Sequence, residues 1–162
     1  MTQHVFDDTA RSDPAFGCEP DERTLEQLLA SGFLLLDKPA GPTSHQLAAW
    51  ARDLLGLDRL GHGGTLDPFA TGVLPLMAGR CMKITNKILK HRKSYIAVLR
   101  FGTPPSDEEL ATTMSSLTGR IYNVPPEVSA VKVQVRTRTV HAFELLDRDD
   151  KDVVARITCD AG

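Results

Sequence analysis

The sequence predicts an α+β domain with a mixed, largely antiparallel sheet and flanking helices. Short apolar runs bounded by turn residues indicate strands, and three of them follow one another near the C-terminus. Segments with apolar residues at helical spacing lie between the earlier runs, which favours α+β over all-β. A length of 162 residues suits one domain with a substantial core.

The first half of the chain contains an acidic tail and then alternating helix and strand patterns. Residues 1–20 lack apolar periodicity, which predicts a flexible tail. The elements expected next are a short helix over Pro20–Leu29, a buried strand over Phe33–Leu36, and a helix from Thr43 or Ser44 to about Leu55. The apolar face expected for that second helix consists of Leu47, Trp50, Ala51, Leu54 and Leu55.

The second half is richer in strand patterns. The expected elements are a strand or short helix over Val73–Met77, a helix over Arg80–Lys90, a strand over Ser94–Phe101, a capped helix over Pro105–Leu117, and strands over Val131–Val135, Val140–Leu146 and Val153–Cys159. Pro125-Pro126 breaks the chain before the last three strands.

Charge is strongly segregated although the net charge is only -2. Residues 1–31 carry seven acids and two bases, whereas Arg80–Arg100 carries seven bases and no acid. Glu144–Asp160 is acidic again, with six acids and three bases. A basic block inside a near-neutral chain indicates either a surface that faces a polyanion or a solvated helix face.

The remaining composition excludes several protein classes. Three widely spaced cysteines, Cys18, Cys81 and Cys159, argue against a disulfide framework and favour a reducing, cytoplasmic location. The acidic N-terminus does not resemble a secretory signal, and no apolar run approaches the ~20 residues that span a bilayer. The histidines and cysteines show no spacing typical of a metal site, so no metal is expected.

One loop, Gly61–Gly72 (GHGGTLDPFATG), holds a single acidic residue, Asp67, among four glycines and a proline. It lacks the Lys-Ser/Thr pair of a phosphate-binding loop, the alternating oxygen ligands of a calcium loop, and the second carboxylate of a retaining glycosidase. Glycines permit unusual backbone angles and close ligand approach, and Pro68 biases Asp67 away from helix. The loop indicates either a rigidly held aspartate that acts as nucleophile or base, or a turn without chemistry.

Four segments in order resemble the motifs of the TruB-type pseudouridine synthases, which isomerise uridine in RNA to its C-glycoside. The segments are LLLDKPAGPTSHQ (34–46), GHGGTLDPFATGVLPL (61–76), KSYIAVLRFG (93–102) and VPPEVSAVK (124–132). ERTLEQLLASG, Gly41–His45 and Arg136–Arg138 are similar to the archaeal and eukaryotic dyskerin-like branch, whose members act in guide-RNA (H/ACA) particles, while Phe101-Gly102 is nearer the bacterial type. The resemblance implies a pseudouridine synthase catalytic fold.

The resemblance assigns roles to individual residues. Asp67 occupies the position of the catalytic aspartate, and Tyr95 that of the tyrosine on which the flipped base stacks. His62 and Lys38 are expected to contact RNA or to position the loop, with a structural salt bridge as the alternative for Lys38. The basic residues expected to bind RNA phosphates are Lys83, Lys87, Lys90, Arg92, Lys93, Arg136 and Arg138.

The resemblance also implies what the chain binds and which parts it lacks. The expected partners are tRNA, or an H/ACA guide RNA with its target, together with small H/ACA proteins, and no cofactor is expected because the isomerisation is redox-neutral. Residues 21–162 correspond to the N-terminal part of the catalytic domain, without the later arginine that pairs with the aspartate and without the C-terminal PUA domain. His141 and Asp160-Ala161 differ from the residues that the family favours there. A catalytically inactive RNA-binding or assembly fragment is therefore the alternative.

Overall fold

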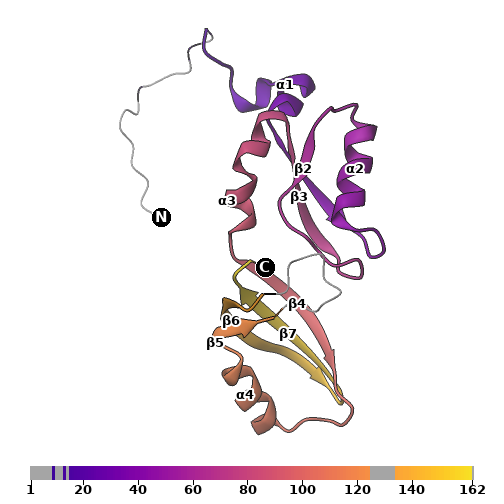
Figure 1. Ribbon diagram of the computed structural model, residues 1–162, viewed down its shortest axis with the longest axis vertical. Coiled ribbons are helices and arrows are strands. Elements are labelled where there is room, and N and C mark those ends of the chain that lie inside the picture. The colour runs from indigo at the N-terminus through magenta and orange to yellow at the C-terminus, as the bar shows by residue number, and fades with distance from the viewer. Residues whose placement is uncertain (1–8, 10–12, 14, 125–133, 162) are drawn as a thin grey trace. The chain divides into compact units, whose positions relative to one another are not determined.

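The computed structural model describes residues 9, 13, 15–124 and 134–161. The chain forms two compact units, Met1–Ile88 and Leu89–Gly162 (Figure 1). Most of the predicted tail lies outside the described residues, as do Pro125-Pro126, most of the VPPEVSAVK motif and most of the predicted strand Val131–Val135.

The first unit is built on a three-stranded antiparallel sheet in the order β1-β3-β2. The strands are β1 (Phe33–Lys38), β2 (Leu60–His62) and β3 (Gly72–Ala78), and β2 was not predicted from the sequence. The register pairs Leu34 with Leu76 and Leu36 with Leu74. Since side chains alternate across a strand, these four leucines face the same side of the sheet.

Helix α2 (Ser44–Leu54) covers that leucine face and forms the core of the unit. Thr43 begins the helix through a capping box with Gln46, as the sequence predicts. Ala48 packs against the buried Leu74 and Leu76. The prediction that Trp50 and Leu54 belong to the buried face is wrong: they are 58% and 87% exposed, because the narrow sheet covers only one strip of the helix.

The remaining helical segments of the first unit are short. They are η1 (Pro20–Glu22), α1 (Leu25–Ala30), η2 (Gly79–Ile84) and α3 (Thr85–Leu89). The helix predicted over Pro20–Leu29 is thus divided, because Thr24 begins α1 with its own capping box. The helix predicted over Arg80–Lys90 is present, but it is divided: its first part, η2, is a 3₁₀-helix with three residues per turn, and only its second part, α3, is an α-helix. Helices α2 and α3 lie on opposite sides of β2 and β3 (Figure 1).

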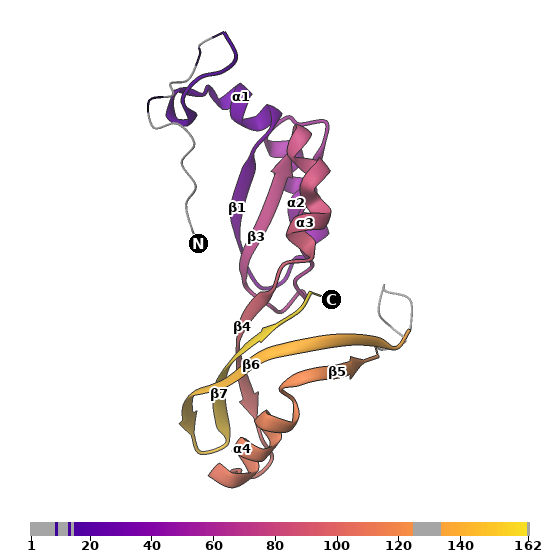
Figure 2. The ribbon, with the colours of Figure 1, turned by 90° about the vertical axis from the view of Figure 1, so that its left-hand side faces the viewer.

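The second unit is a four-stranded antiparallel sheet in the order β4-β7-β6-β5 (Figure 2). Its strands are β4 (Lys93–Arg100), β5 (Gly119–Asn123), β6 (Arg136–Asp149) and β7 (Asp152–Cys159), and β5 was not predicted. Every strand pairing in the described part of the chain is antiparallel, so the predicted α+β class is confirmed. Val153 and Ala155 of β7 are fully buried, which makes this central strand the core of the unit.

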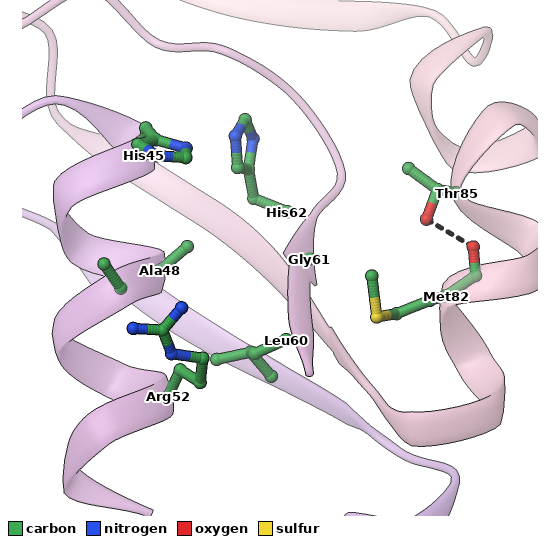
Figure 3. A pocket seen from close by; sticks show the side chains of 9 residues that line it. His45, Ala48, Arg52, Leu60, Gly61, His62, Met82 and Thr85 are labelled. Carbon is green, nitrogen blue, oxygen red and sulfur yellow. Dashed lines mark hydrogen bonds between the residues drawn. The ribbon is translucent and has the colours of Figure 1, made fainter. Parts of the chain in front are cut away.

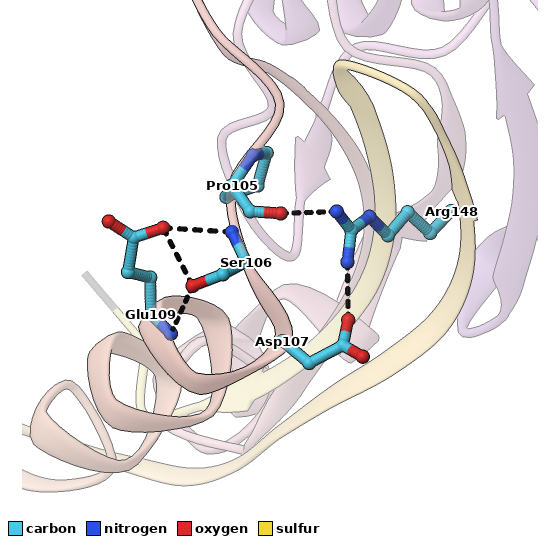
Figure 4. A network of polar contacts seen from close by, with 5 residues as sticks. All are labelled: Pro105, Ser106, Asp107, Glu109 and Arg148. Atoms are coloured by element: carbon cyan, nitrogen blue, oxygen red, sulfur yellow. Dashed lines mark hydrogen bonds and ion pairs between the residues drawn. The ribbon is translucent and has the colours of Figure 1, made fainter.

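Helix α4 (Asp107–Ser116) is fastened to the second sheet at its N-terminal end (Figure 4). Ser106 caps the helix, and its N–H and hydroxyl both donate to Glu109, which lowers the pKa of that carboxyl. The guanidinium of Arg148, on β6, donates to the Asp107 carboxylate and to the Pro105 carbonyl. Leu110, in the first turn of this helix, is buried and only 5% exposed. One arginine therefore joins the start of the helix to the sheet.

Candidate active site

The Asp67 loop is held on its N-terminal side by Ser44, the first residue of α2. The Leu66 N–H donates to Ser44 Oγ at 2.9 Å, and the Ser44 hydroxyl donates in turn to the Leu66 carbonyl at 3.3 Å. Ser44 is 1% exposed, so these bonds are shielded from water. Because Thr43 performs the capping, the Ser44 hydroxyl is available to fix the residue immediately before Asp67.

Lys38, the last residue of β1, holds the C-terminal side of the loop. Its Nζ donates to the carbonyls of Pro39 at 2.9 Å, Pro68 at 3.2 Å and Ala70 at 2.8 Å. Three acceptors match the three protons of an ammonium group, and the side chain is fully buried. Lys38 therefore positions the loop. Its partners are carbonyls, not the carboxylate of the alternative salt bridge, and its burial leaves no surface for RNA.

Backbone bonds complete the attachment of the loop. The Gly41 N–H donates to the Pro68 carbonyl at 2.8 Å, and the Ala70 N–H donates to the Asp67 carbonyl at 3.0 Å, which closes a tight turn. Gly63 allows a close approach on the other side, since a Cβ there would lie 2.6 Å from Ile88 Cγ2. The loop is thus tied to β1 and α2 and lies close to α3.

The Asp67 side chain is exposed, whereas its neighbours in the chain are anchored. Among the described residues, its carboxylate has no hydrogen-bond or ion-pair partner, and no other group consumes its lone pairs. A carboxylate with an immobilised backbone and free oxygens can act as a nucleophile or accept a proton without first breaking an internal bond. This geometry is suited to chemistry on a ligand that approaches from solvent.

His62 lies at the entrance of the loop, at the end of β2. Its Nδ1 lies 2.6 Å from the Gly64 carbonyl, which can only accept, so Nδ1 carries a proton and donates it. The ring meets His45 of α2 edge to face, with a centroid separation of 6.4 Å and an interplanar angle of 76° (Figure 3). The structure therefore brings His62, Lys38 and Asp67 into one loop assembly.

Tyr95 belongs to the second unit, on β4, opposite Ile157 of β7. Its side chain is 40% exposed, so part of the ring is accessible to a ligand and part is packed on the sheet. Phe143 of β6 pairs with the same Ile157 on the other side. Tyr95 thus sits in a row of large side chains across three strands, which is compatible with stacking by a planar group.

The predicted basic residues are spread over several elements. Lys83, Lys87, Lys90 and Arg92 are exposed. Lys83 lies in η2, Lys87 lies in α3 and Lys90 follows the end of α3, so these three lysines do not share one regular α-helix. Lys93, Arg136 and Arg138 are half-buried. Lys93 donates to the backbone carbonyl of His91 at 2.8 Å, and Arg138 donates to the backbone carbonyl of Thr137 at 2.9 Å.

The sequence did not give Ser44 its role at the site, and it named Lys38 without its carbonyl partners. Ser44 was considered only as a helix cap, although two consecutive hydroxyl residues, Thr43-Ser44, leave one of them free for another role. Two of the three carbonyls around Lys38, those of Pro68 and Ala70, come from residues 30 and 32 positions away and give no local signal. In the described part of the chain, no three His, Cys, Asp or Glu side chains are arranged to hold a metal ion, and no helix there could cross a membrane.

Two family models match the chain. Residues 52–109 match the N-terminal domain of the TruB family of pseudouridylate synthases, and residues 2–48 match the DKCLD domain. A protein of Methanothermobacter thermautotrophicus named "Probable tRNA pseudouridine synthase B" is 41% identical over 94% of the chain. A protein of the same name from Methanocaldococcus jannaschii is 43% identical over 91%. The chain spans about half the length of these relatives, 47% and 44%.

Solved structures give the same result for the fold. A chain in a Cbf5-Nop10-Gar1 complex superposes with a TM-score of 0.84 at 36% identity, over 96% of this chain and 47% of that one. A chain in an H/ACA RNP bound to a substrate RNA containing 2'-deoxyuridine superposes with a TM-score of 0.81 at 33% identity, over 96% and 46%. The motifs, the fold and these matches agree: the chain belongs to the TruB family of pseudouridine synthases, in its dyskerin-like branch.

Proposed function

We propose that this chain acts in the isomerisation of uridine to pseudouridine in RNA, with Asp67 as the catalytic carboxylate. The observation that carries the proposal is the contrast within the loop. Leu66 and Pro68 are fixed by Ser44, Lys38 and Gly41, while the carboxylate between them is exposed and has no partner among the described residues. The anchoring would stabilise any turn, but it also holds an exposed carboxylate without a partner in a fixed place, which is what catalysis needs of an attacking group.

The reaction needs one acid group and no redox partner. The C–N glycosidic bond breaks, the base turns, C5 bonds to the ribose C1′, and the C5 hydrogen leaves as a proton while N1 gains one. Asp67 can serve by attacking the sugar, by attacking the base, or by removing a ribose proton. In each case the uridine must leave its stack to reach the loop. Tyr95, with part of its ring exposed, is our proposed stacking surface for the flipped base.

The substrates we propose are the T-loop uridine of tRNA and sites chosen by a guide RNA. Two observations support these two kinds of RNA substrate. Relatives carry the name of a tRNA pseudouridine synthase, and the superposed chains come from H/ACA assemblies. We accordingly propose small H/ACA proteins as partners. The exposed Lys83, Lys87, Lys90 and Arg92 supply phosphate contacts.

The experiment is tritium release from [5-³H]uridine, in an unmodified tRNA transcript and in a guide-directed target. It compares the wild type with Asp67→Asn and with the matched control Asp58→Asn, another exposed aspartate of the first unit. We expect release by the wild type and by Asp58→Asn but not by Asp67→Asn, with RNA affinity retained in all three. Equal release by Asp67→Asn would rule out a catalytic role for Asp67.

The second candidate is an RNA-binding module without turnover. The observation that favours it is that no guanidinium orients the Asp67 carboxylate in the described part of the chain. This candidate predicts salt-dependent RNA binding by every variant and tritium release by none. Absence of salt-dependent RNA binding would exclude both functions.

A further inference from the structure

Phe69 is a large apolar residue that lies in solvent close to the loop aspartate. It follows Asp67 by two positions in the chain and is 79% exposed. A single exposed phenylalanine is ordinary on a protein surface and by itself needs no explanation. The exposure of Phe69 matters because the ring belongs to the same turn as the carboxylate that we assign to catalysis.

Asp67 and Phe69 are the first and third residues of one four-residue turn. The Ala70 N–H donates to the Asp67 carbonyl at 3.0 Å and closes this turn. Pro68 occupies the second position, where its ring fixes φ at the value that common turns require. The backbone therefore holds the Cα atoms of Asp67 and Phe69 at a nearly constant separation.

Both peptide groups next to Phe69 are held in place. The carbonyl before it, of Pro68, accepts from Lys38 Nζ at 3.2 Å and from the Gly41 N–H at 2.8 Å. The peptide group after it donates its Ala70 N–H across the turn, and Lys38 Nζ also binds the Ala70 carbonyl at 2.8 Å. Because Lys38 is fully buried, water does not compete for its bonds. A ring on such a fixed backbone loses little conformational entropy when a ligand packs on it.

The chemistry proposed for Asp67 indicates which part of a nucleotide meets this ring. In two of the three routes the carboxylate acts at the ribose, by attacking C1′ or by removing a ribose proton. The face of the base is already assigned to Tyr95. A ring in the same turn as the carboxylate is therefore placed to contact the sugar. Ribose C–H groups are polarised by the neighbouring oxygens, and they pack favourably on the negative face of an aromatic ring.

We propose that Phe69 packs against the ribose of the target nucleotide and positions it beside Asp67. The inference rests on the proposed function, because it takes the target uridine to be bound at this loop. During the isomerisation the base is detached from the sugar while it turns, so the sugar needs a contact that does not depend on the base. A ring fixed in the turn of the carboxylate keeps C1′ in place until C5 bonds to it.

The test measures binding of the full chain to three versions of a tRNA T-arm hairpin by fluorescence anisotropy. The target position carries uridine, an abasic ribose, or a propanediol spacer that lacks both sugar and base. The protein variants are Phe69→Ala, which removes the ring, and Phe69→Tyr, which keeps it. Because Phe69 is exposed, both substitutions leave the core of the unit intact. Phe16→Ala is the matched control, since Phe16 is 91% exposed and lies in the same unit outside the loop.

We expect Phe69→Ala to weaken binding of the uridine RNA and of the abasic RNA about tenfold, the scale of burying most of a phenylalanine side chain. Binding of the spacer RNA should not change. Phe69→Tyr and Phe16→Ala should bind all three RNAs as the wild type does. An effect confined to the uridine RNA would mean that the ring contacts the base, and an equal effect on all three would mean that it contacts another part of the RNA. Either result, or no effect of Phe69→Ala, would overturn the ribose contact.

The comparison of the three RNAs with the wild type separates this inference from the proposed function. A wild type that binds the uridine and abasic RNAs no better than the spacer RNA has no site for the target nucleotide, which contradicts both. A wild type that distinguishes the spacer RNA, together with a Phe69→Ala variant that distinguishes it equally well, overturns the role of Phe69 alone.

Discussion

His141 and Asp160 hydrogen-bond to each other, with Nε2 and Oδ1 2.8 Å apart. Both are positions at which the sequence departs from the family pattern, and the structure shows that the two departures are in contact. His141 lies at an irregularity in the register of β6, between Val140 and Ala142, and Asp160 directly follows β7. The Asp160 carboxylate also accepts from the Thr139 N–H at 3.0 Å. The pair fastens the end of β7 to the neighbouring strand.

This pair predicts a specific loss of stability in acid. The hydrogen bond from His141, followed by the bonds from Thr139, holds the pKa of Asp160 below its ordinary value of 3.8. A lowered folded-state pKa gives stability that is fully present above the ordinary value and disappears as the pH falls through the folded value. The difference in Tm between the wild type and Asp160→Asn should therefore be fully developed above about pH 5 and shrink below about pH 4. A difference that stays constant down to pH 3 would contradict this explanation.

Replacing Lys38 by Met should destabilise the first unit by about 2–4 kcal/mol, because three carbonyls then lose a charged donor in a buried place. Urea unfolding measures this loss. Lys87→Met is the matched control, since Lys87 is exposed, and its effect should stay within about 0.5 kcal/mol. Equal effects of the two substitutions would show that Lys38 does not hold the loop.

Replacing Ser44 by Ala should loosen the residue before Asp67 while α2 keeps its cap from Thr43. The expected cost is about 1–2 kcal/mol, the usual effect of leaving buried polar groups without a partner. Amide hydrogen exchange provides the measurement: the Leu66 N–H should exchange faster, with little change at Leu47 in the helix. Ser115→Ala, on the exposed side of α4, should leave the Leu66 N–H unchanged.

Removing the Arg148 guanidinium should release the start of α4 from the second sheet. Arg148→Gln loses both the Asp107 and the Pro105 contacts, so protection of the Leu110 N–H should fall. Asp107→Asn should have a smaller effect, because the Asp107 side chain is 94% exposed and exposed ion pairs contribute little. A larger effect of Asp107→Asn would indicate that the charge, not the carbonyl contact, fastens the helix.

The exposed lysines Lys83 and Lys87 should contribute affinity without sequence choice. The double substitution to Gln should weaken binding of all RNAs alike and reduce the slope of log K against log salt by about one unit per lysine. Lys151→Gln, in the acidic turn between β6 and β7, is the control and should leave the slope unchanged. Selective loss for one RNA would point to base contacts at these lysines instead.

The sequence predicted most elements whose signals are local. The caps at Thr43 and Ser106 and the strands around Phe33–Leu36 and Val153–Cys159 could be read from residues close together in the chain. Strand β2 was missed because Leu60–His62 is short and contains a glycine, and it is a strand only because β3 pairs with it. Trp50 and Leu54 were assigned to the core because helical periodicity shows which residues share a face and does not show how wide the covering sheet is.

The sequence by itself determined the α+β class, the family and the position of the single loop aspartate, because motifs and caps depend on residue type and short spacing. Only the tertiary structure decided that Lys38 is buried beneath the loop, that Ser44 binds Leu66, and that His141 meets Asp160. These contacts join residues 19 to 32 positions apart. A separation of that size leaves no periodic trace in the sequence, because the pairing exists only after the strands and α2 have packed.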